Sequence, residues 1–325
     1  MEWHTVLKIS DPGFSIEHKD QILALGSCFS QEIGGCMEDA KFKIYINPFG
    51  TLYHPEAIAR VLEYGLGRQR WHPELATNQQ DVWYSWHHHG KVSSISEENL
   101  QVQIEKIHSE LKEYLKKTKI IMITPGTAWG YKLKSSNEVV ANCHKAPAQI
   151  FEKVMMSPES VSDCFQKMIY NVRAQFPEIK FVFTVSPVRH LRDGFHENQL
   201  SKASLLLGIQ EVVEQNNNVF YFPSYEIMLD ELRDYRFYAA DNIHPSDEAI
   251  QYIWKQFRSW SMTESTESLI QEILGLHAQL RHKAFHTETA KYKFFKEKLQ
   301  NQLDKLRLGY PEIDWGKEVE GMGKL

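Results

Sequence analysis

The 325-residue sequence contains no apolar stretch close to the roughly 20 residues that a membrane-spanning helix needs. An excess of basic residues is also missing, since the formal net charge is -5, and this disfavours a nucleic-acid-binding protein. Residues 1–7 lack the basic segment and the apolar stretch of a secretory signal peptide. We therefore expect a cytoplasmic protein that binds neither membranes nor nucleic acids.

Cysteine is scarce, with four residues and no Cys-x-x-Cys pair. Four thiols in a chain of this length do not form a disulfide scaffold. A zinc site built from Cys28, Cys36, Cys143 and His144 is conceivable, but buried structural thiols are the more common outcome for such spacing. We therefore expect no metal and no cofactor.

Short apolar runs alternate with helical patterns along most of the chain. Such alternation is typical of a parallel sheet covered by helices on both faces. The predicted strands are 22–25, 43–46, 120–124, 181–185 and 219–222, and the predicted helices among them are 31–39, 55–64, 97–116, 157–175 and 199–215. The sequence thus predicts a three-layer α/β/α sandwich around a parallel five-stranded sheet.

Two regions depart from this alternation. Residues 66–96 are rich in Trp, His and polar side chains, and we expect them to form a long ordered loop. Beyond residue 260 the chain becomes helical, over 268–281 and 287–306, and ends in a tail from Gly309. The predicted organisation is an α/β domain over 1–260 and a helical C-terminal extension over 261–325.

The run Gly26-Ser27-Cys28-Phe29-Ser30 lies between the end of the first predicted strand and the start of the following helix. Side chains at that point lie at the carboxyl edge of the sheet, where ligands bind in open α/β folds. The free N–H groups at the start of the helix also favour developing negative charge. A hydroxyl or thiol here is therefore a candidate nucleophile.

The second motif is Asp241-Asn242-Ile243-His244, which follows the last predicted strand and precedes a helix over 246–257. An Asp three residues before a His can accept the hydrogen bond of the ring Nδ1–H and leave Nε2 free as a base. An isolated pair of this kind is more often a surface turn. Its place after the last strand favours a catalytic role.

The chain resembles the GSCFA-domain family, whose name corresponds to the run at residues 26–30 with Ser30 in place of the final Ala. The resemblance covers roughly residues 20 to 260. It is carried further by Asn47-Pro48-Phe49-Gly50-Thr51, by Thr124-Pro125-Gly126-Thr127-Ala128-Trp129, by Asn142-Cys143-His144-Lys145 and by Ser186-Pro187-Val188-Arg189-His190. The GSCFA domain is in turn similar to the SGNH (GDSL-like) hydrolases.

This resemblance implies a catalytic triad of Ser27, His244 and Asp241, with an oxyanion hole from Gly50 and Asn142. Gly126-Thr127 is a rival oxyanion donor, because it lies nearer its strand end. SGNH enzymes have the sequence Gly-Asp-Ser around the nucleophilic serine. When Gly26-Ser27-Cys28 is aligned with it without a gap, Ser27 matches the Asp and Cys28 matches the nucleophilic serine. We prefer Ser27 and keep Cys28 as the alternative. A third reading makes Ser27 a helix cap and Cys28 a core residue.

Substrate contacts are expected from His89, in the aromatic segment 83–89, and from Arg189 and His190 after the fourth strand. Aromatic rings in that segment could stack on sugars, whereas Trp129 and Tyr131 read as packing residues. The expected function is hydrolysis of an acyl ester, such as an O-acylated carbohydrate, through an acyl-enzyme. An acyltransferase using the same triad, or a non-catalytic carbohydrate-binding module with this fold, are the alternatives.

Overall fold

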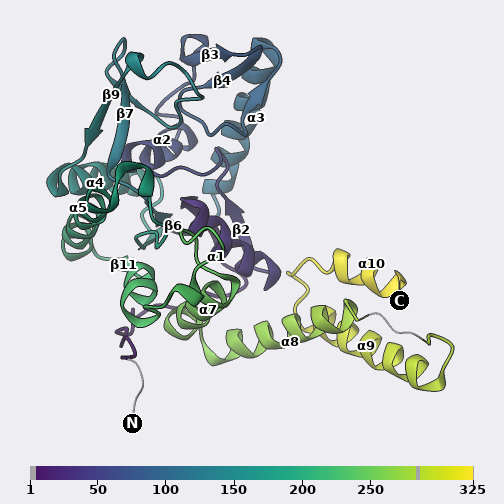
Figure 1. Cartoon of the computed structure of the whole chain (residues 1–325). Helices are drawn as coiled ribbons and strands as arrows, with labels where there is room; N and C mark the ends of the chain where they lie inside the picture. Colours follow the sequence, from purple (N-terminus) through teal and green to yellow (C-terminus); the bar gives the residue numbers. More distant parts are fainter. Residues whose placement is uncertain (1–4, 283–285, 325) are drawn as a thin grey trace.

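A computed structural model of the protein describes residues 5–282 and 286–324. Its centre is a five-stranded, wholly parallel sheet with the order β11-β10-β6-β1-β2. The strands are β1 (Gln21–Gly26), β2 (Lys43–Ile46), β6 (Thr118–Thr124), β10 (Lys180–Phe183) and β11 (Val219–Tyr221). The five predicted strands are confirmed to within a few residues, and the fold is mixed α/β (Figure 1).

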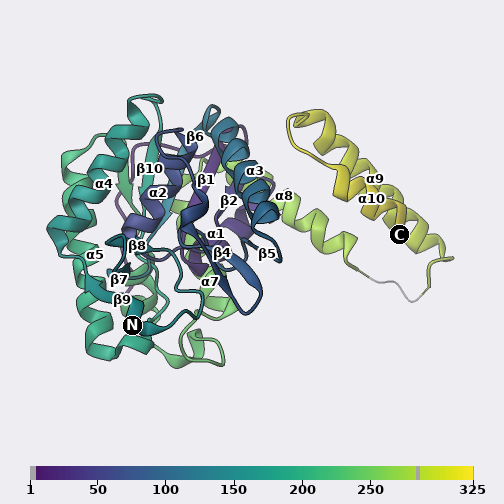
Figure 2. The ribbon, with the colours of Figure 1, turned by 90° about the horizontal axis from the view of Figure 1, so that it is seen from above.

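Consecutive residues of the central strands point to opposite faces of this sheet. In β1, Leu23 and Leu25 belong to one hydrophobic cluster, whereas Ile22 and Ala24 belong to another. Both faces are therefore buried, as continuous apolar strands require. Helices α2 (Pro55–Gly65), α3 (Glu97–Leu115), α4 (Pro158–Arg173) and α5 (Phe195–Gln215) pack into the first cluster, and α1 (Cys28–Asp39) and α7 (Asp247–Ser261) into the second. In Figure 2, α4 and α5 lie along one side of this α/β domain.

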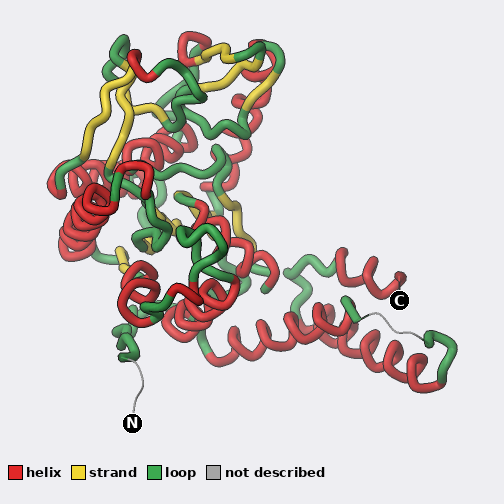
Figure 3. The backbone as a smooth tube through the Cα atoms, in the orientation of Figure 1, coloured by secondary structure: helices red, strands yellow, loops and turns green. Residues whose placement is uncertain are grey.

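Two small antiparallel sheets were not predicted. The segment expected to be a loop over 66–96 contains a hairpin-like sheet, and a second sheet follows β6. The strands are β3 (Ala76–Gln79), β4 (Val82–Ser85) and β5 (Ser93–Ser94) in one, and β7 (Trp129–Leu133), β8 (Glu138–Val140) and β9 (Phe151–Met155) in the other. These strands are short and mostly half-exposed, so they lack the apolar runs on which the prediction depended. Figure 3 shows both sheets at the end of the domain remote from the C-terminus.

The C-terminal helices form an arm that projects from the α/β domain (Figures 1 and 2). It consists of α8 (Glu264–Leu280), α9 (Ala290–Gly309) and α10 (Gly316–Lys324), which share a hydrophobic cluster of their own. The predicted tail from Gly309 is corrected here, because Ile313, Trp315 and Met322 are buried in that cluster and order the last segment as a helix.

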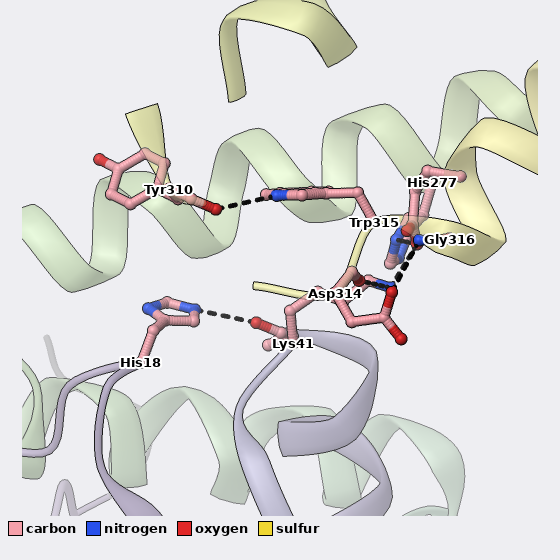
Figure 4. A network of polar contacts seen from close by, with 9 residues as sticks. His18, Lys41, His277, Tyr310, Asp314, Trp315 and Gly316 are labelled. Atoms are coloured by element: carbon pink, nitrogen blue, oxygen red, sulfur yellow. Dashed lines mark hydrogen bonds and ion pairs between the residues drawn. The ribbon is translucent and has the colours of Figure 1, made fainter. Parts of the chain in front are cut away.

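A buried ion-pair network attaches this arm to the α/β domain (Figure 4). Glu318 of α10 has a side chain only 4% exposed, and its Oε1 lies 2.7 Å from both Lys41 Nζ and His277 Nε2. Lys41 follows the end of α1 and also donates to the carbonyl of Asp314 at 3.0 Å. On the same side, His18 bonds the carbonyl of Ala40 at 2.9 Å. Polar contacts thus hold the end of α1 against α8 and α10.

In the ranges 5–282 and 286–324, no helix has the length and apolar character needed to cross a membrane. Residues 1–4, which form part of the N-terminal segment considered for targeting, lie outside the described residues.

Candidate active site

The turn after β1 is the tightest point of the sheet edge. Gly26 has φ +140°, and a Cβ added there would lie 2.2 Å from the carbonyl oxygen of Thr124. The Gly26 N–H donates to Asn47 Oδ1 at 2.8 Å, and the Ser27 N–H donates to the Thr124 carbonyl at 3.0 Å. Only glycine fits this combination of conformation and contact. The ends of β1, β2 and β6 are thereby locked together around the start of α1.

Ser27 and Cys28 differ sharply in accessibility. Ser27 is 0% exposed, and its Oγ is enclosed without a hydrogen-bond partner in the described chain. Cys28, the first residue of α1, is half-buried. Burial raises the pKa of the Cys28 thiol, and the backbone N–H groups of Phe29 and Cys28 oppose that rise. The Ser27 hydroxyl is therefore enclosed, whereas the Cys28 thiol is partly accessible to solvent.

Asp241 and His244 form the expected dyad in the loop between β11 and α7. His244 Nδ1 and Asp241 Oδ2 are 2.6 Å apart, and Asp241 Oδ1 accepts the backbone N–H groups of Ile243 and His244. Hydrogen bonds, led by the backbone N–H of His244, lower the pKa of Asp241 to about 2. The carboxylate is therefore ionised at neutral pH and fixes the ring, whose Nε2 bonds to none of the described residues.

The dyad and the candidate nucleophiles Ser27 and Cys28 are not joined by a hydrogen bond. No hydrogen bond connects His244 to Ser27 or Cys28 within the described residues, and the side chains of His244 and Asp241 are 48% and 47% exposed. Burial lowers the pKa of His190 to about 4, and the charges of Lys202 and of the nearby His244 lower it further.

Gly126 marks the place where His190, Tyr53 and Ser27 approach one another. A Cβ added to Gly126 would lie 3.0 Å from His190 Nε2, 3.1 Å from Tyr53 Cδ1 and 3.5 Å from Ser27 Cβ. The rings of Tyr53 and His190 pack edge to face, with centroids 5.1 Å apart. The Gly126 and Thr127 N–H groups both donate to the Tyr53 carbonyl, at 2.8 and 3.2 Å. Both amides already donate to a protein carbonyl, so neither is free to bind an oxyanion in this conformation.

Of the other two predicted oxyanion donors, the Gly50 N–H has a protein partner, whereas Asn142 is engaged through its side-chain oxygen and its Nδ2 bonds to none of the described residues. The Gly50 N–H donates to the Asn47 carbonyl at 2.7 Å, and a Cβ on Gly50 would lie 2.4 Å from His89 Cβ. Asn142 Oδ1 accepts the His144 N–H at 2.8 Å. Asn47 belongs to the motif 47–51 but was not predicted as a site residue. Its side chain is buried, with Oδ1 accepting the Gly26 N–H and Nδ2 without a partner in the described chain.

A cleft of about 630 Å³ opens beside this edge. Tyr53 and His190 connect it to the nucleophile turn, and Asn142 and Cys143 stand on its wall. Its aromatic lining comes from Trp129, Tyr131 and Phe151, and its charged lining from Lys145, Lys153, Arg192 and Asp193. Trp129 and Tyr131, which the sequence analysis interprets as packing residues, are thus also part of the cleft wall.

The aromatic segment 83–89 does not line this cleft. Trp86 is 7% exposed and packs edge to face on Phe151, and Tyr84 stacks on His144. His88 is fully buried, with Nε2 3.3 Å from His108 Nε2. His89, the expected contact residue, lies behind Gly50 and accepts the Lys91 N–H. The segment packs the β4 region onto the domain, as the large buried area of its rings favours.

Arg189 also differs from expectation, because it donates to the Tyr238 hydroxyl at 3.0 Å and stacks on that ring instead of lining the cleft. His190 does reach the cleft. The part of the chain that the structure describes contains no group of three or more His, Cys, Asp and Glu side chains placed to hold a metal ion.

Comparison with known families matches the chain twice. The GSCFA family model matches residues 21–257, and the model described as GSCFA domain protein, C-terminal domain, matches residues 273–322. The first match spans the five-stranded sheet, the Gly26–Cys28 turn and the dyad, and the second spans most of the arm. No curated protein matches the sequence. The chain belongs to the GSCFA family.

Proposed function

We propose that the protein hydrolyses acyl esters with a Cys28–His244–Asp241 triad, on a three-layer α/β/α sandwich of the SGNH type. The observation that carries this is the Asp241–His244 dyad, preformed at 2.6 Å on the sheet edge where Cys28 starts a helix. A half-buried thiol, a base with its orienting carboxylate and a helix N-terminus are the parts that acyl transfer needs.

The reaction begins when His244 Nε2 takes the Cys28 proton and Sγ attacks the acyl carbon. The carbonyl oxygen of the substrate becomes an oxyanion at the first turn of α1, where backbone N–H groups have no intrahelical acceptor. His244 then protonates the leaving alcohol, and a thioester remains on Cys28. A water molecule, deprotonated by His244, attacks the thioester, and the carboxylic acid leaves as the thiol recovers its proton.

The substrate class follows from the cleft. Tyr53 and His190 link it to the Gly26–Cys28 turn, and Trp129, with Lys153 over its ring, and Tyr131 give it the aromatic wall that sugar-binding clefts use. We therefore propose an O-acylated carbohydrate, bound so that its acyl group reaches Cys28.

Turnover of p-nitrophenyl acetate tests the proposal in the wild type and in the Cys28→Ala and Ser27→Ala variants. Cys28→Ala should lose turnover, and an acetyl adduct should be found on the Cys28 peptide of the wild type by mass spectrometry. Ser27→Ala should keep activity and stability, because the Ser27 hydroxyl makes no hydrogen bond in the described chain.

Cys143→Ala is the matched control, since Cys143 is another half-buried thiol and lines the cleft. If Cys143→Ala loses as much turnover as Cys28→Ala, p-nitrophenyl acetate acylates thiols without specificity for Cys28. Loss in Ser27→Ala alone would restore Ser27 as the nucleophile. An inert wild type that still binds glycans would make the protein a carbohydrate-binding module.

A further inference from the structure

The charged side chains that line the 630 Å³ cleft do not cancel one another. Lys145, Lys153 and Arg192 are basic, and Asp193 is the one acidic residue among the described residues of the lining. Three positive charges against one negative charge leave the wall with a formal charge of +2, although the chain as a whole carries -5. The cleft is therefore a positive site on a negative protein, and such a site favours an anionic ligand.

One of the three cations is already paired. Lys153 Nζ lies 2.5 Å from Asp193 Oδ1 and 4.3 Å from the centre of the Trp129 ring. Lys153 stands on β9 directly across from Tyr131 on β7, so that both side chains are on the same face of this small sheet. The ion pair is therefore a neutral part of the aromatic wall, and its lysine is not available to a ligand.

Other basic groups beside the cleft add no accessible charge. Burial lowers the pKa of His54 to about 3 and that of His190 to about 4, so both rings are neutral at pH 7. Lys202, on α5, is 1% exposed, and its Nζ donates to the carbonyls of Gly126 at 2.7 Å and Ser186 at 2.6 Å. Lys202 is thus enclosed by protein and cannot contact a molecule in the cleft.

The remaining cations are Lys145 and Arg192, and neither has a partner. Their exposed side chains form no hydrogen bond and no ion pair with any residue in 5–282 and 286–324. Glu197, the acid that follows Arg192 most closely after Asp193, folds back against Gly194 at the start of α5. A guanidinium group presents two parallel N–H donors that match a carboxylate, and an ammonium group adds a further donor.

We propose that the carbohydrate bound in this cleft is an acidic sugar, whose carboxylate is held by Arg192 and Lys145 while its ring lies against Trp129 and Tyr131. This inference rests on the proposed function and narrows its substrate class from carbohydrate esters in general to O-acylated uronic acids. The two free cations distinguish acidic from neutral sugars, because a neutral sugar leaves both of them without a counter-charge.

Binding of two matched sugars tests the proposal without any ester. Methyl α-galactopyranosiduronate and methyl α-galactopyranoside differ only at C6, where the first has a carboxylate and the second a hydroxymethyl group. In calorimetric titrations at low ionic strength, where exposed charges are least screened, the uronate should bind about tenfold more tightly. The methyl ester of the uronate, which keeps the carbonyl without the charge, should bind like the neutral sugar.

Two variants with the same loss of charge locate the effect. Lys145→Met/Arg192→Met should reduce the preference for the uronate to about twofold or less. Arg70→Met/Lys112→Met is the matched control, since both residues are exposed and neither lines the cleft, and it should keep the wild-type preference. Asp193→Asn, which removes the acid from the lining, should increase the preference several-fold, so the prediction can be tested in both directions.

Equal affinities of the wild type for the uronate and the neutral sugar, or no binding of either, would overturn the proposal. A full preference in Lys145→Met/Arg192→Met would overturn it as well. Tighter binding of the 6-sulfate of methyl galactopyranoside than of the uronate would refute the assignment to a carboxylate.

The esterase and the acidic-sugar site fail separately. If no ester is hydrolysed but the uronate is preferred and the preference is lost in Lys145→Met/Arg192→Met, the esterase is wrong and the acidic-sugar site stands. If esters are hydrolysed through Cys28 and the two sugars bind alike, the acidic-sugar site is wrong and the esterase stands.

Discussion

Gly26 and Thr124 are paired across β1 and β6, and the space between them leaves no room for a side chain. A Cβ on Gly26 would lie 2.2 Å from the Thr124 carbonyl oxygen, 2.7 Å from its carbonyl carbon and 2.9 Å from its nitrogen. All three contacts are with backbone atoms, which cannot turn aside as a flexible side chain could. The position of Cys28 at the helix start thus depends on a contact between two backbones.

Gly26→Ala should therefore destabilise the protein by on the order of 2–4 kcal/mol, from steric overlap and the positive φ together. Urea unfolding followed by circular dichroism measures this change. The matched control is Gly35→Ala, in the middle of α1, where an added Cβ meets nothing within 4 Å. That substitution should stabilise α1 by up to about 1 kcal/mol, since alanine has the higher helix propensity. Equal, small effects of the two substitutions would refute the steric argument.

Asp241→Asn should lower turnover by about 10³–10⁴-fold with little loss of stability. The amide can still accept the backbone N–H groups of Ile243 and His244, but it no longer favours the tautomer with a free Nε2. The kcat of ester hydrolysis, compared with the thermal midpoint, separates the two effects. If kcat changes less than tenfold, the dyad is a surface turn and not a catalytic element.

Stability should fall as the pH decreases below about 6.5, because several histidines are buried in the neutral form. Burial lowers the pKa of His54 to about 3, of His87 to about 2, and of His108 and His190 to about 4. The unfolded chain, with histidines near 6.5, binds more protons between pH 6.5 and 4, so acid favours unfolding in that range. Thermal midpoints should decline steadily from pH 6.5 toward pH 4.

His87→Gln tests this explanation, since glutamine can still accept the Tyr64 hydroxyl bonded to His87 Nδ1 at 2.7 Å but does not titrate. The fall in thermal midpoint between pH 7.5 and pH 5 should be smaller in His87→Gln than in the wild type. His196→Gln, at an exposed position, should leave the fall unchanged. If the thermal midpoint falls equally in all three proteins, His87 does not contribute to the acid sensitivity.

Removing the lysine that attaches the arm should loosen α10. Lys41→Met leaves Glu318 buried with only His277 as its partner, at a cost on the order of 2–4 kcal/mol. Trypsin should then cut within α9 and α10 sooner than in the wild type, as followed by mass spectrometry. Lys43→Met, two residues on and exposed, should show the wild-type pattern. Unchanged cleavage in Lys41→Met would mean that the hydrophobic cluster alone holds the arm.

The main sheet could be predicted because its strands are continuous apolar runs. The dyad could be predicted because Asp241 and His244 are three residues apart and form a local turn. The place of Trp129 and Tyr131 on the cleft wall could not be predicted, since a ring beside a cleft and a ring in the core look alike in sequence and differ only in what packs against them. Ser27 and Cys28 are adjacent in sequence, so only the three-dimensional structure reveals which of the two is enclosed.

Lys202 gave no signal at all, because it stands in an ordinary helical pattern between Ser201 and Ala203. The partners that define it, the carbonyls of Gly126 and Ser186, are backbone atoms far away in the sequence. The types of the residues around Lys202 do not show which backbone carbonyls will accept its hydrogen bonds. A buried lysine of this kind can be recognised only in the three-dimensional structure.

Helix α1 begins at Cys28 and ends at Asp39, and Lys41, which binds Glu318 of the arm, follows two residues later. At 1.5 Å per residue, its twelve residues make a rod about 18 Å long. The thiol stands at the first residue of this helix, and the anchor of the arm stands just beyond its last one. One helix thus separates Cys28 from the ion pair that holds the arm.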